Sequence, residues 1–289
     1  FGVNKMELIS LKYAIFVIVL LVLYYCFPKK YRWYVLLAGS MAYYVIICKW
    51  YVLFIIFTIC TTYGSTIWID KLLKEQNAIV KSHKEDWDRQ TRKEYKEKGR
   101  KKRVAVMLFA LLCNFGILAF LKYIPYAGEL GLLLPLGISF YTFQSMGYVM
   151  DVYREIVEPE KNFLKVALFV SFFPQIIQGP IAIYDKLAGQ LYEGHSLRLE
   201  NLQKGALLVL WGVMKKLVIA DRAVNIINFV MDKPMDFSGT YVFFAAVVYA
   251  LQLYADFSGG IDIVRGIAEM FGITTVSYTH LRAHETELH

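Results

Sequence analysis

Apolar residues gather in six long runs separated by charged stretches. The runs lie at Tyr13–Phe27, Tyr31–Cys48, Trp50–Ile69, Val104–Leu121, Leu130–Met150 and Leu164–Ile183. They are almost free of charge, and the later runs approach the roughly 20 apolar residues that cross a bilayer core of about 30 Å as a helix. None has the strict alternation of a barrel strand, and only helices or closed barrels satisfy backbone groups in lipid. The pattern predicts an all-α, polytopic transmembrane helical bundle.

Helix-breaking residues interrupt the apolar pattern in the second half of the chain. They are Pro135, Gly137, Pro174, Gly179 and Pro180. Proline and glycine end or kink a straight helix, and irregular backbone at membrane depth persists only where protein or a water-filled cavity shields it. We therefore expect interrupted or re-entrant helices around an internal polar cavity or channel. Leu207–Ala220 is short for a complete span and fits a re-entrant segment.

Composition and charge support a multi-pass membrane protein and argue against a nucleic-acid partner. Hydrophobic residues make up 57% of the 289 positions, more than the roughly 45–50% of soluble domains. The net charge of +8 comes almost entirely from 71–103, a helix-prone connector with 13 Lys/Arg and six Asp/Glu. Such a segment is typical of a cytosolic loop that obeys the positive-inside rule. We expect one domain over 6–274, interrupted by this basic cytosolic loop.

The same rule predicts the orientation of the first spans. Lys29, Lys30 and Arg32 mark an inside loop, which places the N-terminus outside. We expect Met6 to be the true start. The first run is expected to be a retained helix, because no small-x-small cleavage site follows it. Lys122–Gly131 is then outside, and Asp151–Asn162 returns to the cytosol.

Charged residues inside the second half are the first candidates for function. They are Lys215, Lys216, Asp221, Asp256 and Asp262. Charges are costly in lipid and face a protein interior by default. For the two lysines, snorkelling to an interface is an equally good interpretation, and Asp221 with Arg222 fits a short interfacial turn.

Asp256 is harder to explain structurally. It stands beside Ser258 and the pair Gly259–Gly260, with Asp262 close behind. Two acids around a glycine pair, after an aromatic-rich helix, favour a helix end that lines a wet site. By contrast, Tyr141, Gln144 and Ser145 are also consistent with a purely interhelical hydrogen-bonding role, worth about 0.6 kcal/mol each in membranes.

Cysteine and histidine give no metal site. Cys26, Cys48, Cys60 and Cys113 lie in or at the ends of apolar runs without CxxC spacing, as expected for inert buried thiols. His83 lies in the basic loop, and His195 lies in the polar connector 184–204. Both are expected to be solvated.

Three segments carry a resemblance to a known family. They read LPLGISFYTFQSMGYVMDVYR, FVSFFPQIIQGPI and YALQLYADFSGGIDIVRGIAEMFGI. These segments resemble the membrane-bound O-acyltransferase family, most closely its bacterial branch that O-acetylates alginate, peptidoglycan and other envelope polysaccharides. That branch includes the D-alanyl transferases of teichoic acid. The opening YYCFPKKYRWYVLLAGSMAYY is similar to the same branch, so the resemblance covers about Met6 to Ile273.

The resemblance implies a funnel of helices around a thin central partition in the bacterial inner (plasma) membrane. An acetyl or similar acyl group would come from a cytosolic thioester, acyl-CoA or an acyl carrier protein, with no bound cofactor. The acceptor would be an extracytoplasmic polysaccharide hydroxyl, reached directly or through a relay protein. Such transfer needs a base near neutral pKa, which suits histidine. The substrate-lining candidates within the matching segments are Tyr141, Gln144, Gln178, Asp256 and Ser258.

The family's catalytic histidine, set in an apolar helix downstream of the DFSG-like segment, has no counterpart here. His280 and His284 have helical i, i+4 spacing, but Thr, Arg and Glu surround them without a further ligand for zinc. The stretch VSYTHLRAHET can be written codon by codon as a sequencing-library adapter. We therefore expect 275–289 to be a non-native tail, the histidine to lie beyond the chain, and the fragment to be inactive.

Two alternatives remain open from the sequence. Broken helices at membrane depth are also typical of transporters and channels, although the chain shows no repeated halves. The basic loop, in turn, is suited either to an acidic carrier protein or to anionic lipid headgroups.

Overall fold

The computed structural model of the chain describes residues 9–83, 87–123, 135–179 and 181–275. Every regular element in these ranges is helical, which confirms the predicted all-α class. The contacts group the chain into two compact units, each described by itself. The first comprises Phe1–Val35, Ile177–Pro180 and Glu193–His289, and the second comprises Leu36–Ile176 and Ile181–Tyr192. The single domain over 6–274 stays a prediction.

Several helices have the length and composition of membrane spans. In chain order the elements are α1 (Leu11–Cys26), the 3-10 turn η1 (Lys29–Tyr31), α2 (Arg32–Cys48), η2 (Lys49–Tyr51), α3 (Val52–Ser82), α4 (Arg89–Tyr123), α6 (Ile138–Tyr153), α7 (Phe163–Ser171), α8 (Phe173–Gln178), α9 (Tyr184–Tyr192), α10 (Leu199–Met214), the π-helix η3 (Lys215–Ala220), α11 (Asp221–Met231), η4 (Pro234–Asp236) and α12 (Gly239–Met270). Among the described residues, three helical stretches are long and apolar enough to cross a bilayer: Lys29–Ser82, Arg89–Tyr123 and Gly239–Met270. These stretches support a membrane protein.

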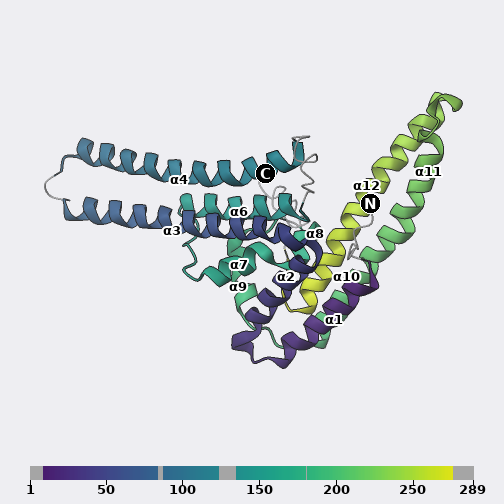
Figure 1. Cartoon of the computed structure of the whole chain (residues 1–289), viewed down its shortest axis with the longest axis horizontal. Helices are drawn as coiled ribbons and strands as arrows, with labels where there is room; N and C mark the ends of the chain where they lie inside the picture. The colour runs from purple at the N-terminus through teal and green to yellow at the C-terminus, as the bar shows by residue number, and fades with distance from the viewer. Residues whose placement is uncertain (1–8, 84–86, 124–134, 180, 276–289) are drawn as a thin grey trace, which may run out of the picture. The chain divides into compact units, whose positions relative to one another are not determined.

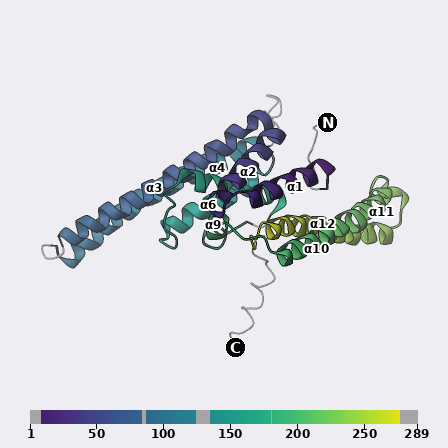
Figure 2. The same cartoon turned by 90° about the horizontal axis from the view of Figure 1, so that it is seen from below.

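The second unit is organised along the long antiparallel pair α3 and α4. The two helices run side by side in Figure 1 and again in Figure 2, and α3 also contacts α6 and α7. The basic segment 71–103, expected as a connecting loop, consists mainly of the ends of these two helices. α3 continues to Ser82 and α4 begins at Arg89. The helix-prone basic segment therefore extends both helices instead of forming a separate loop.

The predicted helix interruptions are found where the structure describes them. α6 begins at Ile138, directly after Gly137, whose φ of 70° is the left-handed conformation that glycine readily adopts. α7 ends at Ser171 and α8 begins at Phe173, with Pro174 in the first turn of α8, where its missing N–H breaks no helical bond. The start of the run Leu130–Met150 lies outside the described residues. The polar connector 184–204 contains α9 and the start of α10.

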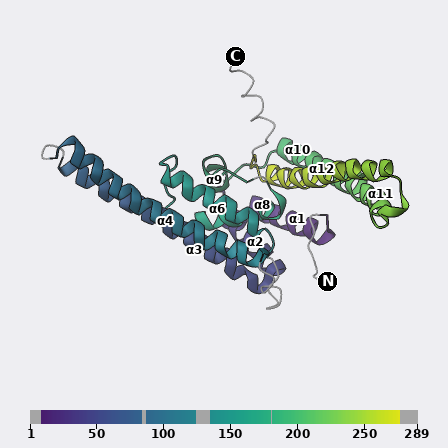
Figure 3. The ribbon, with the colours of Figure 1, turned by 90° about the horizontal axis from the view of Figure 1, so that it is seen from above.

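The first unit contains a long helical hairpin. α10, η3 and α11 follow one another without a break from Leu199 to Met231, and they pack along α12, as Figure 3 shows. The segment Leu207–Ala220, which fits a re-entrant turn by length, is therefore the interior of a longer helix. Its apparent shortness came from Asp221 and Arg222, which end the apolar stretch but not the helix.

Candidate functional site

Glycine residues bring α10 and α12 into backbone contact. A Cβ atom at Gly205 would lie 2.5 Å from the carbonyl oxygen of Gly266, and a Cβ at Gly212 would lie 2.5 Å from that of Gly259. The contacts are reciprocal and seven residues apart on each helix. Small residues permit this close approach of membrane helices. The approach sets the position of η3, which follows α10, against the middle of α12.

Two lysines of η3 form ion pairs with two aspartates of α12. Lys215 Nζ lies 2.6 Å from Asp262 Oδ2, and Lys216 Nζ bonds Asp256 Oδ1. Arg265 adds a longer contact of 3.7 Å to the Asp262 carboxylate. The lysines lie in a π-helix, whose wide turn is often found at functional sites. They pair within the unit, as expected for charges inside a membrane protein. Whether the lysines also reach a membrane interface stays a prediction.

Asp256 and Ser258 do not mark a helix end. α12 continues without interruption from Gly239 to Met270, so both residues lie within it. The acid and glycine cluster instead serves helix contact, since Gly259 faces α10 and the acids face the lysines. The expectation of a helix end at this point is therefore wrong, because the Gly259–Gly260 pair reads as a break in sequence but works as a packing surface.

Gln178 joins this part of the first unit. A Cβ atom at Gly260 would lie 2.2 Å from its Oε1, so the carboxamide rests on the α12 backbone. Asp256 is four residues before Gly260, on the same face of α12. The hydroxyl of Ser258 is buried and has no hydrogen-bond partner within the described residues. Three of the five predicted site residues thus belong to one unit, next to two ion pairs.

Tyr141 and Gln144 belong to the second unit, where each makes a packing contact. Gln144 Nε2 donates to the Phe169 carbonyl oxygen over 2.8 Å. Phe169 is among the last four residues of α7, whose carbonyls have no partner within the helix, so Gln144 satisfies one of them. Tyr141 is 1% exposed and meets the ring of Tyr44 edge-on, with centroids 6.3 Å apart. Whether either side chain also lines a substrate site stays a prediction.

Gln175 is a further candidate that the sequence interpretation passed over. It is 3% exposed, and within the described part of the chain neither Oε1 nor Nε2 has a hydrogen-bond partner. The hydroxyl of Ser171, one helical turn earlier in the sequence, is also buried without a partner there. An unsatisfied buried polar group costs about 1–3 kcal/mol. The segment FFPQIIQGPI holds two glutamines, and only burial distinguishes Gln175 from Gln178.

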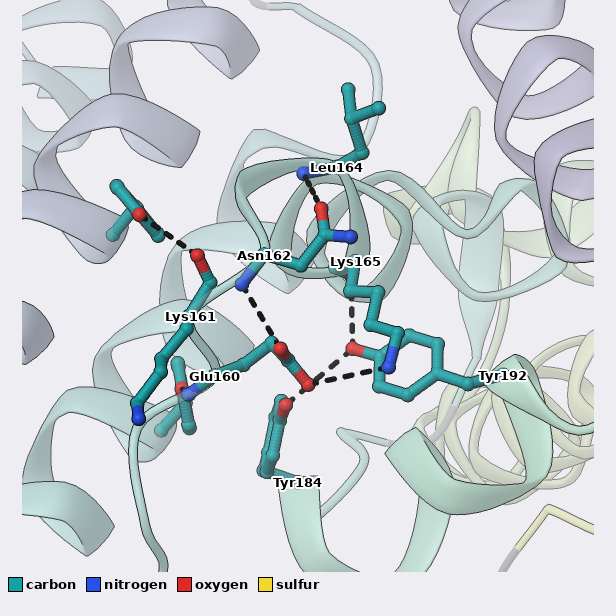
Figure 4. Close-up of polar contacts among 9 residues, drawn as sticks. Glu160, Lys161, Asn162, Leu164, Lys165, Tyr184 and Tyr192 are labelled. Atoms are coloured by element: carbon teal, nitrogen blue, oxygen red, sulfur yellow. Dashed lines mark hydrogen bonds and ion pairs between the residues drawn. The ribbon is translucent and has the colours of Figure 1, made fainter.

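A hydrogen-bonded network fixes the turn between α6 and α7 (Figure 4). Glu160 Oε1 accepts from the Asn162 N–H over 3.0 Å, and its Oε2 lies 3.7 Å from Lys165 Nζ. The Tyr192 hydroxyl donates to the Lys165 carbonyl over 2.9 Å, and Tyr184 lies beside it. Burial raises the pKa of Tyr192 well above its ordinary value of 10, and the neighbouring Tyr184 raises it further. The Tyr192 hydroxyl therefore remains a neutral hydrogen-bonding partner at physiological pH.

The fixed turn forms one wall of a pocket of about 320 Å³, and α3 forms the other. Its charged lining groups are Asp70, Lys74, Glu155 and Glu158. Glu155 is held by Arg103, with Nη1 2.8 Å from Oε1. Three carboxylates against one lysine make this pocket unsuited to a phosphate-bearing ligand.

Of the described histidines, His195 alone belongs to the first unit, which contains the α12 site. His83 lies just beyond α3, stacked on Trp87 with centroids 4.8 Å apart. His195 is not the solvated residue expected: it is half-buried, its carbonyl accepts from Arg32, and its Cβ lies 2.6 Å from a Cβ built at Gly272. Gly272, which His195 contacts, follows the end of α12. Ser258 is 12 residues before that end, about 18 Å away along the helix axis, so His195 does not lie beside Ser258.

Metal ligation and the terminal histidines are the remaining questions. The described residues contain no group of three His, Cys, Asp or Glu side chains placed to hold a metal ion. His280, His284 and the predicted non-native tail fall outside the described residues, apart from Thr275.

Comparison with known proteins confirms the predicted resemblance. No family model matches the chain. The chain is 32% identical over 205 residues to the peptidoglycan O-acetyltransferase of Helicobacter pylori, covering 58% of this chain and 39% of that protein. It is 36% identical over 142 residues to a probable alginate O-acetylase AlgI of Pseudomonas syringae pv. tomato, covering 48% and 27%. A probable alginate O-acetylase AlgI of Pseudomonas aeruginosa is 34% identical over 143 residues, covering 49% and 27%. The chain thus spans well under half the length of these relatives.

Proposed function

We propose that the chain is part of a membrane-bound O-acyltransferase that acetylates a cell-envelope polysaccharide outside the bacterial inner membrane. The observation that carries the proposal is the 32% identity over 205 residues with a peptidoglycan O-acetyltransferase. The spans in both units supply the membrane setting. Alginate, peptidoglycan and a teichoic-acid-like polymer are the acceptor classes that we propose.

The reaction moves the acetyl group from a cytosolic thioester to a sugar hydroxyl. The hydroxyl oxygen attacks the thioester carbonyl, its proton goes to a base, and the C–S bond breaks to release a thiol. The donor is acyl-CoA or an acyl carrier protein, and the acetyl group reaches the polysaccharide directly or through a relay protein. No bound cofactor is required, because the thioester is itself the activated group.

The five predicted residues have different roles in this proposal. Gln178 and Ser258 line the polar region next to the two ion pairs, and Asp256 belongs to one of these pairs. The neutral side chains of Gln178 and Ser258 orient a hydroxyl or a carbonyl there. Tyr141 and Gln144 support the second unit, and Gln175 joins them as a group available to a polar substrate. A histidine outside the described residues acts as the base, since His83 and His195 have other surroundings.

The direct test is acetyl transfer by the protein encoded at the complete locus, reconstituted in vesicles. Radiolabelled acetyl-CoA is supplied on one side and an oligosaccharide acceptor on the other. We expect label on the acceptor as an ester that mild alkali releases. The 289-residue chain alone is expected to insert without transferring acetyl.

A transporter or channel is the alternative, since α7 and α8 are short, separate helices in an apolar stretch. Passage of the labelled donor or acceptor across the vesicle, with no ester formed, would replace the acyltransferase proposal by this alternative.

A further inference from the structure

Side-chain contacts hold α3 and α4 together beyond their apolar stretches, in the part that we call the hairpin. Gln76 is 5% exposed and its Nε2 donates to the Lys96 carbonyl oxygen over 2.9 Å. Gly99 provides the space for it, because a Cβ there would lie 2.5 Å from the Gln76 Cδ. This contact fixes the register of the two helices.

Aromatic side chains order the far end of the hairpin as well. The ring of Trp87 stacks on His83 and contacts Tyr95, with a centroid separation of 5.1 Å to the tyrosine. Ordering a chain costs conformational entropy, about 1–2 kcal/mol per residue for the backbone. Setting the orientation of the spans in the membrane requires only positive charge near their ends, and a flexible loop supplies that charge equally well. The ordered hairpin therefore calls for a further explanation.

Four exposed cations form a line along α4, which we call the basic stripe: Arg89, Lys93, Lys96 and Arg100. Their spacing of four, three and four residues puts them on one face of a helix. None of them takes part in an ion pair within the described residues. The described ion pairs of the hairpin acids are with other lysines, as in Lys101–Glu97 at 3.5 Å and Lys71–Glu75 at 3.9 Å.

The outer half of the stripe extends beyond the membrane surface, which argues against lipid headgroups as the main partner. The charge-free stretch Val104–Leu121 is about 27 Å long as a helix and so accounts for the hydrocarbon core. α4 continues straight beyond it, which places Arg100 about 5 Å and Arg89 about 21 Å past Arg103. Headgroups occupy about 5–7 Å on each side, and the Debye length is about 8 Å at physiological salt. Arg89 and Lys93 therefore lie at or beyond the range of headgroup charge.

We propose that the basic stripe is a docking surface for an acidic helix of a water-soluble protein. A helix laid along α4 repeats every 3.6 residues, so carboxylates spaced by four, three and four residues face all four cations together. The hairpin holds these cations in place before the partner arrives, which lowers the entropic cost of binding. The inference is independent of the proposed acetyl transfer, because it concerns binding alone.

The test uses the whole chain in nanodiscs of phosphatidylcholine and a labelled synthetic helical peptide. One peptide carries glutamates at i, i+4, i+7 and i+11, and a second has the same composition with the glutamates spread around the helix. We expect the spaced peptide to bind about tenfold more tightly, and its affinity to fall with added salt. Reversing the stripe (Arg89→Glu, Lys93→Glu, Lys96→Glu, Arg100→Glu) should remove this preference.

A matched variant reverses four cations of the same hairpin outside the stripe: Lys81→Glu, Lys98→Glu, Lys101→Glu and Lys102→Glu. It has the same net charge as the stripe variant and should keep the preference for the spaced peptide. Trp87 fluorescence reports whether the hairpin remains folded in each variant. Equal binding of both peptides to the unmodified chain, or equal loss in both variants, would overturn the proposal in favour of a diffuse positive field.

Nanodiscs that contain phosphatidylglycerol distinguish the lipid alternative. If the stripe serves a soluble partner, anionic lipid should change the affinity for the spaced peptide by less than about threefold, because the distal cations lie out of range. A loss as large as that of the stripe variant would show that headgroups occupy the stripe, and the proposal would fail.

Discussion

At the scale of single residues, the ion pairs between η3 and α12 are the main feature of the first unit. Lys215 and Asp262 are 47 positions apart, and their side chains are 18% and 13% exposed. The sequence marked all four charged residues as candidates because charges in apolar segments are rare. It could not pair them, since pairing depends on how α10 packs on α12.

Removing one member of a shielded pair should be more harmful than removing both. Asp262→Asn leaves the Lys215 ammonium without its close carboxylate, and we expect the free energy of unfolding to fall by about 2–3 kcal/mol, allowing for partial exposure. The double variant Lys215→Met/Asp262→Leu should recover much of this loss. Thermal unfolding in detergent measures both. Glu200→Gln, which breaks the exposed pair with Lys204, serves as the control and should have no measurable effect.

Gln144 offers a second test at this scale. Gln144→Leu removes the donor to the Phe169 carbonyl at the end of α7, and we expect a loss of about 0.6–1.7 kcal/mol in unfolding free energy. Acetyl transfer by the full protein should fall only as far as stability does. A fall in transfer without a loss of stability would instead assign Gln144 to the substrate site.

At the scale of elements, glycine decides which helices approach each other closely. Proline and glycine positions in the sequence correctly indicated breaks before α6 and between α7 and α8, because these residues act on the local backbone. The same logic failed at Gly259, where glycine permits contact with α10 inside a continuous helix. Local sequence does not distinguish a glycine that ends a helix from one that packs against another.

Enlarging a glycine at this contact should separate α10 from α12. Gly212→Leu places a side chain where the Gly259 carbonyl lies, and we expect a loss of about 1–3 kcal/mol in unfolding free energy. The control is Gly116→Ala in α4, where nothing lies within 4 Å of an added Cβ. That substitution should be neutral or stabilise the chain by up to about 1 kcal/mol. Equal effects of the two changes would contradict the close contact.

The turn between α6 and α7 should respond to alkaline pH through Tyr192. Its pKa is raised in the folded chain, so above pH 10 the unfolded chain releases a proton that the folded chain retains. Stability should therefore fall as pH rises above 10 and be unaffected by this group below that value. Unfolding followed across this range should show a shallower decline in Tyr192→Phe. An unchanged slope would mean that Tyr192 ionises equally in both states.

At the scale of the whole molecule, apolar composition and segment length predicted the all-α membrane class correctly. These properties depend on sums over many residues and tolerate local error. The extent of α3 and α4 was underestimated, because charged residues such as Lys96 and Arg100 end an apolar run but not a helix. Gln175 was missed for a related reason: its unsatisfied burial is a property of packing around it.

The central claim is that the protein acetylates a polysaccharide of the cell envelope. The measurement that tests it most directly is alkali-labile acetate in the envelope polysaccharides of the source strain. It is compared between the parent, a deletion of the locus and the deletion complemented with the complete locus. The account predicts that acetate falls on deletion and returns with the complete locus, but not with the 289-residue chain alone. Unchanged acetate in the deletion strain would contradict the claim.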